Sequence, residues 1–173
     1  MDFTHLENLF KNMAALILQH TIPAANISLA YPQEQPPECS TAEDIVFIRL
    51  LEQDSDYSRP LNISYESTDD TVLKHASRTR VWQLQLAIYG PAAHQNITRI
   101  KDGVFRQDIK RYLAESSVFL VPDLPLCQRI TDQPAAAGFN RWDVALTFNE
   151  LHMLPVEDLG SIQSVAITTK YNH

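Results

Sequence analysis

The chain has 173 residues and a mass of 19.7 kDa, with 45% hydrophobic and 20% charged residues. This length predicts one domain over residues 1–173, with a core that forms without disulfides or metal ions. Four glycines and ten prolines are too few for a low-complexity chain. The 21 acidic residues outnumber the 14 basic ones, and the net charge of -7 argues against a general attraction to nucleic acid or anionic lipid.

No segment predicts membrane insertion or secretion. The longest apolar run, residues 13–18, is far shorter than the roughly 20 residues that cross a bilayer. Asp2 and Glu7 stand where a signal peptide is basic. Cys39 and Cys127 lack any paired spacing, which favours reduced thiols. We therefore expect a protein that is made and stays in a cytoplasm, without a membrane partner.

Residues 2–20 predict a first, amphipathic helix. The apolar residues that recur with a period of about 3.6 are Phe3, Leu6, Leu9, Phe10, Met13, Leu16 and Ile17. Ile22-Pro23 ends this helix, because proline disfavours helical geometry in the residue before it. Residues 31–44 hold four acids, three prolines and no basic residue, so they predict an exposed polar loop.

Several later segments predict strands. Residues 45–51 are rich in β-branched and aromatic residues, whereas residues 80–90 and 141–149 alternate between apolar and polar. The alternation puts two sets of four on the core face: Trp82, Leu84, Leu86 and Ile88, and Trp142, Val144, Leu146 and Phe148. Residues 118–121 predict a short strand, and the shifted alternation of 160–169 predicts a bulged last strand. The polar residues 52–79, with a weak alternation at 61–65, predict a hairpin arm or a long loop.

Residues 92–114 predict a second helix after Gly90-Pro91. Its apolar face turns by about a third of a turn at Gly103, which indicates either a bend or close packing there, or a tolerated exposed glycine. Together these elements predict an α+β, two-layer domain, with an antiparallel or mixed sheet and two main helices packed on one face.

The chemistry-bearing motifs are few. The four glycines are too scattered to cradle a phosphate, and the histidines and cysteines lack the spacing of a zinc site. Glu150 and His152 could form an acid/base pair, but a solvated pair at a strand end is the stronger interpretation. Cys127 has apolar neighbours, which favours a buried inert thiol over a nucleophile. We therefore expect no enzymatic activity, no metal and no cofactor.

The helix 92–114 carries a basic stripe. A solvated face is its first explanation, contact with an acidic neighbour the second, and a phosphate groove the third. The acids of the 31–44 loop offer such a neighbour in a second copy of the chain, which favours self-association through unlike patches. The candidate subunit interface comprises Glu34, Glu38, Glu43, Asp44, Arg99, Arg106 and Lys110.

A series of segments taken in order carries a family resemblance: an amphipathic first helix, a proline-rich loop leading to residues 44–51, the unit 80–93, and residues 139–148 and 158–167. Together they resemble the neck or tail terminator proteins of tailed bacteriophages. The strand that ends in Tyr89-Gly90, before a helix that starts with small residues, is the most telling piece. Residues 52–79 depart from the shorter patterns of that family.

The resemblance implies a structural virion protein, assembled in the host bacterial cytoplasm, that forms a hexameric ring at the head-tail junction. Such a ring caps the tail, joins it to the head, and contacts tail tube and head connector proteins. It implies no catalysis, and DNA would pass an acidic lumen without specific binding. Two alternatives remain: a small hydrolase-like enzyme whose site is formed only by tertiary structure, and a nucleic-acid-binding module that uses the helix 92–114.

Overall fold

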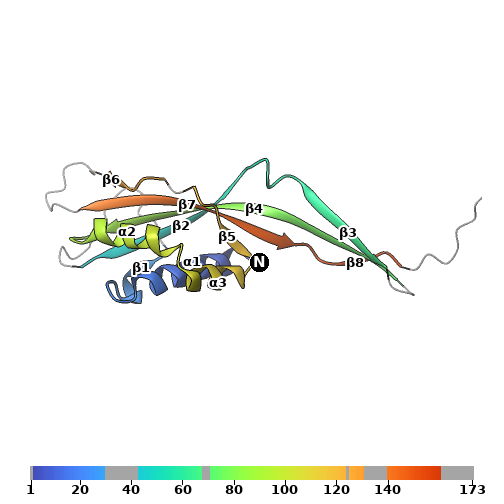
Figure 1. Ribbon diagram of the computed structural model, residues 1–173, viewed down its shortest axis with the longest axis horizontal. Helices are drawn as coiled ribbons and strands as arrows, with labels where there is room; N and C mark the ends of the chain where they lie inside the picture. The colour runs from blue at the N-terminus through green and yellow to red at the C-terminus, as the bar shows by residue number, and fades with distance from the viewer. Residues whose placement is uncertain (1, 30–42, 68–70, 124, 131–139, 161–173) are drawn as a thin grey trace, which may run out of the picture.

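The computed structural model describes residues 2–29, 43–67, 71–123, 125–130 and 140–160. A helical layer covers one half of a long sheet, and the other half of the sheet extends beyond the helices (Figure 1). The elements in chain order are α1 (Phe3–Leu18), the 3-10 turn η1 (Ala24–Asn26), β1 (Ile27–Ser28), β2 (Ile45–Gln53), β3 (Leu61–Ser67), β4 (Val72–Tyr89), α2 (Ala93–Gly103), α3 (Gln107–Ala114), β5 (Val118–Leu120), β6 (Gln128–Ile130), β7 (Arg141–Met153) and β8 (Glu157–Asp158).

The sheet is open and mixed, which confirms the predicted α+β class. Its main order is β1-β2-β4-β7-β5, and only the pair β1 and β2 is parallel among the described strands. β3 and β8 pair with β4, and β6 pairs with β7. The strand predicted over residues 80–90 begins earlier, at Val72, because β3 and β8 provide hydrogen-bond partners for a stretch that lacks a clear apolar alternation.

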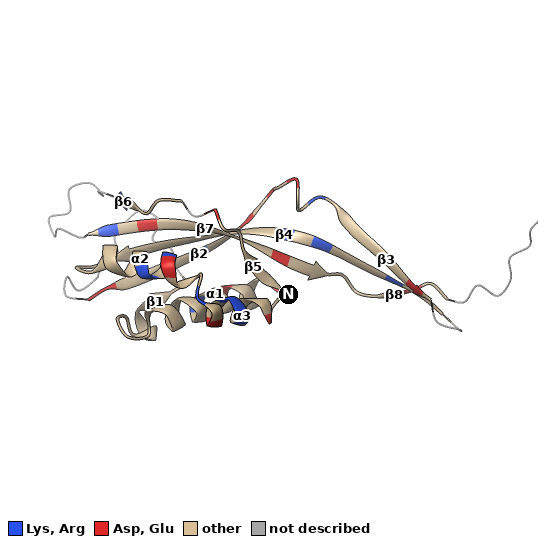
Figure 2. Cartoon of the chain, viewed as in Figure 1, with Lys and Arg blue, Asp and Glu red and all other residues tan. Residues whose placement is uncertain are grey.

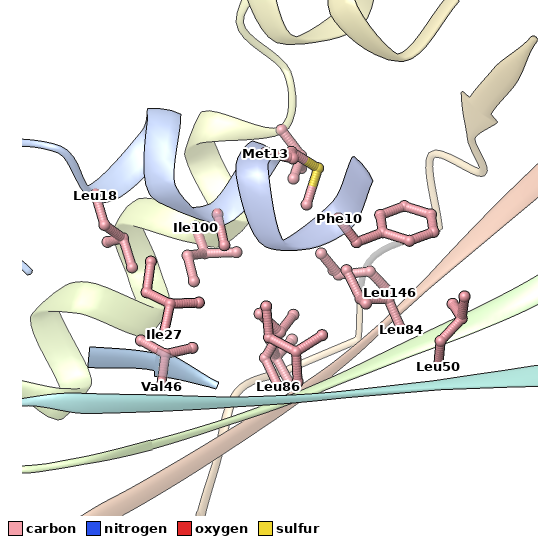
Figure 3. Close-up of a cluster of buried hydrophobic side chains, with 14 of the residues drawn as sticks. Phe10, Met13, Leu18, Ile27, Val46, Leu50, Leu84, Leu86, Ile100 and Leu146 are labelled. Carbon is pink, nitrogen blue, oxygen red and sulfur yellow. The ribbon is translucent and has the colours of Figure 1, made fainter. Parts of the chain in front are cut away.

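The core lies between the helices and the sheet face that the alternation predicts (Figure 3). Seven of the eight predicted sheet residues are buried, and the eighth, Trp142, is half-buried against the same core. From α1, Leu6, Phe10 and Met13 are fully buried, because the 3.6-residue period aligns them on one face of the helix. Phe3 and Leu16, at the margins of the predicted stripe, are exposed.

The prediction of one helix over residues 92–114 is wrong, because the chain forms α2 and α3 with a break after Gly103. Short-range hydrogen bonds from Phe105 N to Asp102 O and from Arg106 N to Gly103 O tighten this break. Gly103 is buried against α1, where an added Cβ would lie 2.5 Å from Cγ2 of Ile17. Of the predicted roles for this glycine, close packing and a bend therefore hold, and an exposed position does not.

Beyond the helices the sheet continues as a narrow extension, here called the arm, which consists of residues 61–67, 72–79 and 151–158 (Figure 1). β3 pairs antiparallel with β4 from Leu61 opposite Arg78 to Ser67 opposite Val72. Of the two predictions for residues 52–79, the hairpin is therefore the structure formed. All seven residues of β3 are exposed.

Some predictions lie outside the described residues. They concern most of the loop 31–44, with Glu34, Glu38 and Cys39, and nearly all of the bulged last strand over 160–169.

Candidate assembly surfaces

The root of the arm holds a buried carboxylate. Glu150 on β7 is 1% exposed, and its Oε2 accepts hydrogen bonds from Arg80 Nε at 2.9 Å and Trp82 Nε1 at 2.7 Å. His152 Nδ1 lies 3.8 Å from Oε1 of Glu150. The prediction of a solvated pair at a strand end is therefore wrong for Glu150. β4 runs beside β7 here, and the pairing of Arg80 opposite Glu150 brings the two charges together.

The environment of His152 disfavours its charged form. Burial lowers the pKa of this imidazole below 6.5, the Arg80 guanidinium lowers the pKa further, and the Glu150 carboxylate opposes both. The Glu150 carboxylate on β7 accepts hydrogen bonds from Arg80 and Trp82 on β4. These bonds hold β4 and β7 together at the point where the arm begins.

Asp44, from the predicted interface, is bound within its own chain. Its Oδ1 accepts a hydrogen bond from the Ala92 N–H at 3.0 Å, and its Oδ2 accepts one from Asn96 Nδ2 at 2.9 Å. Asp44 therefore supplies the acceptor at the start of α2 that a local capping residue usually provides. Gly90 has a φ of +133° and packs on Asp44, so a side chain at this position would collide with it. Glu43 beside it is exposed.

The break between α2 and α3 divides the predicted basic stripe. Arg99 and Arg106 line one shallow pocket of about 300 Å³, whereas Lys110 lies on α3 with its Nζ 5.6 Å from the Phe105 ring centroid. Arg106 makes two hydrogen bonds to Asp108, of 3.1 and 2.6 Å, and these lower the pKa of that carboxyl. The structure thus places Arg99 and Arg106 at one pocket and Lys110 beside the Phe105 ring, one helical turn after Arg106.

A groove between α3 and β5, here called the α3–β5 groove, was not found by the sequence patterns. Its cavity volume is about 420 Å³. Its floor and walls include Leu113 and Val118, and its rim carries Phe105 and Phe119, which are 43% and 52% exposed. The groove also contains Lys110 and the exposed Arg111, and within the described residues the Arg111 side chain forms no hydrogen bond or ion pair. The groove is therefore apolar with a cationic margin.

The arm presents a row of exposed apolar side chains on one face of β3, here called the arm row: Leu61, Ile63 and Tyr65. They share a face because side chains alternate along a strand, and they are 48%, 47% and 63% exposed. One edge of β3 is bonded to β4, and among the described strands no other strand pairs with β3. An exposed apolar strand of this kind marks a site of pairing or docking.

The described residues offer little for catalysis. No three of their His, Cys, Asp or Glu side chains are placed to hold a metal ion. Cys127 is half-buried, and burial raises the pKa of its thiol, which lowers the thiolate fraction. None of the helices found in these parts of the chain has the length and apolar character to cross a membrane.

Comparison with known proteins finds a family and a similar structure, although no curated protein matches the chain. The fold is similar to the sheath/tube terminator of the extracellular contractile injection system PVC in its extended state, with a TM-score of 0.51 and 10% identity. That match covers 100% of this chain and 64% of the terminator's length. The family model described as phage neck terminator protein matches residues 7–172, and the chain therefore belongs to the phage neck terminator family.

Proposed function

We propose that this chain is a structural virion protein that caps the end of the tail and joins it to the head. The observation that carries the proposal is the match of the phage neck terminator family to residues 7–172. The similar fold of a sheath/tube terminator supports the same role at the end of a tube. The family is a structural one, and this favours a protein without an enzymatic activity of its own.

The protein acts as a ring of its own copies, with six as the proposed number. One surface of each copy contacts a different surface of the next copy, which is a heterologous interface. Such contacts close into a ring when the rotation between neighbouring copies divides a full turn. The exposed arm and the charged helical surface supply two unlike surfaces. Charged side chains between copies set the register, and the remaining candidates are Glu34, Glu38, Glu43, Arg99, Arg106 and Lys110. Asp44 is not among them, because both of its carboxylate oxygens are bound within its own chain.

The partners of this ring are tail tube proteins on one side and head connector proteins on the other. DNA passes through the lumen without specific binding, because a chain with a net charge of -7 repels phosphates. The protein is made in the host cytoplasm and becomes part of the virion there.

The test uses particles assembled with and without the protein. We expect the chain in purified virions, as a ring at the neck in cryo-electron microscopy, and unjoined heads and tails when the protein is missing. Addition of the purified protein to these heads and tails restores joining. Virions that lack the chain, or heads and tails that join equally well without it, would contradict the proposal.

A further inference from the structure

We propose that residues 161–169 of one copy add a strand to the free edge of β3 in the next copy of the ring. This inference rests on the proposed ring and names a contact that joins its copies. The occupant of the edge is a named segment of a second copy, and backbone hydrogen bonds hold it, as they do wherever an extended segment joins the edge of a sheet.

The acceptor is the outer edge of β3. β4 pairs with one edge of β3 over all seven residues, and among the described strands no other strand pairs with β3. A strand at the edge of a sheet presents N–H and C=O groups that point away from the sheet, and such an edge is a template for a further strand. Glu66, near the end of the arm, is an acidic position on an otherwise uncharged β3 (Figure 2). Little charge therefore opposes the approach of a neutral segment.

The side chains of β3 favour a partner strand with apolar residues. The arm row, Leu61, Ile63 and Tyr65, is exposed on one face of β3. Directly opposite residues on neighbouring strands have Cβ atoms about 5 Å apart, so an added strand would bring its own side chains against this row. Removing the row from water would stabilise the pairing beyond what the backbone hydrogen bonds contribute.

Residues 161–169 have the composition of such a partner, and the sequence predicts a last strand here. The segment contains no charged residue, no proline and no glycine, and five of its nine residues are Ile, Val or Thr, which favour strands. Val165 and Ile167 are two residues apart, so in a strand they share a face and can pack on the arm row. The segment is therefore neutral, β-branched and apolar on one face.

The described chain ends where this segment can reach a neighbouring arm. Gly160 O accepts a hydrogen bond from Val72 N at 3.1 Å, and Leu159 N donates one to Val72 O at 2.9 Å, so the segment starts beside the first residue of β4 at the end of the arm. Nine extended residues span about 30 Å, and the seven residues of β3 span about 23 Å. The segment is thus long enough to run along the whole of β3 in an adjacent copy.

The donor and the acceptor lie on opposite edges of one arm. β4 pairs with both β3 and β8 at Leu73 and Lys74, so β3 and β8 lie on opposite sides of β4, and the segment after Gly160 leaves from the β8 side. To reach β3 of its own chain, the segment would have to cross the ends of β4 and β3. In arms that lie side by side, the β8 edge of one copy instead faces the β3 edge of the next. The contact is therefore heterologous and repeats around a rotation axis.

The first test is photochemical crosslinking in assembled particles. The photoreactive residue p-benzoylphenylalanine replaces Tyr65 in the arm row, and in a matched control it replaces Leu126, an exposed residue outside the arm. We expect position 65 to give chain-to-chain products attached within residues 161–169, and position 126 to give none of them above background. The reciprocal placement at Ile167 should give chain-to-chain products attached within residues 61–67. Products within a single chain, products with another virion protein, or equal yields from positions 65 and 126 would overturn the inference.

The second test interrupts the donor with proline, which lacks the N–H group that strand pairing needs. Successive N–H groups along a strand point to opposite edges, so Val165→Pro and Ala166→Pro are made separately, and one of them removes an N–H that faces β3. We expect at least one of the two to lower the crosslinking yield at position 65 about tenfold. The control Asn172→Pro lies outside the proposed strand and should leave the yield unchanged.

An unchanged yield in both proline variants, Val165→Pro and Ala166→Pro, would overturn the inference. The two proposals fail in different ways. A ring that is present in virions while the crosslinks form elsewhere contradicts this contact alone, whereas virions without the chain contradict the proposed function.

Discussion

Glu150 shows how one side chain can hold two parts of a sheet in place. A buried carboxylate loses its hydration, and this cost is offset only when charged and polar donors surround it. Arg80 and Trp82 supply those donors from β4, and the Arg80 guanidinium also lies 4.9 Å from the centroid of the Trp82 ring. The contact therefore ties β4 to β7 at the point where the core ends and the arm begins.

Replacing this carboxylate should destabilise the fold strongly. Glu150→Ala leaves the Arg80 charge and the Trp82 N–H without their acceptor, so we expect the free energy of unfolding to fall by about 3 kcal/mol. Chemical denaturation measures this loss. The control is Glu66→Ala. It removes an exposed carboxylate whose Oε2 lies 3.3 Å from His75 Nε2, and it should lower the free energy of unfolding by less than about 1 kcal/mol. Equal losses in both variants would contradict a special role for Glu150.

His152 should make the stability depend on pH. Burial and Arg80 keep its folded-state pKa below 6.5, so the unfolded chain binds protons more readily. The free energy of unfolding therefore falls as the pH drops through about 6.5. In His152→Gln we expect a smaller drop in Tm between about pH 7.5 and about pH 5.5 than in the wild type. The exposed His20 is the control, and His20→Gln should retain the wild-type pH dependence.

The central strands supply the core, and truncation there measures how tightly the helices pack on them. Leu86 on β4 is fully buried, so Leu86→Ala should lower the free energy of unfolding by about 2 to 5 kcal/mol. Leu126, which is 80% exposed, provides the control, and Leu126→Ala should change stability by no more than about 0.5 kcal/mol. A small effect at Leu86 would show that the sheet face is not packed as described.

The contact of α1 with α2 depends on the missing side chain of Gly103. Alanine has a higher helix propensity than glycine. We nevertheless expect Gly103→Ala to lower the free energy of unfolding by about 1 to 3 kcal/mol, because the added Cβ would press against Ile17. In an Ile17→Ala background the same change should cost less, or even stabilise, since the obstacle is gone. A double-mutant cycle measures this coupling, and equal costs in both backgrounds would contradict the close packing.

Two of the three segments of the arm, residues 61–67 and 72–79, can be removed without touching the core. β2 and β4 are an antiparallel pair up to Gln53 opposite Val81, so an Asn-Gly turn in place of residues 55–79 can close them directly and keep Arg80. None of the buried residues in the main core cluster lies in 55–79. We expect a folded variant by circular dichroism that no longer joins heads to tails. Normal joining by this variant would contradict a role for the arm.

The local patterns of the sequence were sufficient to predict the layer of helices and the layer of strands. Alternation along residues 80–90 and 141–149 identified the core face of both long strands, and the period of residues 2–20 identified the buried face of α1. These predictions are confirmed because a side chain's direction follows from the repeat of its own helix or strand. The family resemblance is confirmed too, by the match over residues 7–172.

Contacts between distant segments determined the rest. The close packing at Gly103 depends on Ile17, the burial of Glu150 depends on Arg80 and Trp82, and the role of Asp44 depends on the start of α2. The first half of β4 becomes a strand because β3 and β8 satisfy its backbone, although its own sequence shows no clear alternation. Burial, charge pairing and backbone satisfaction belong to pairs of segments, so periodicity within one segment cannot reveal them.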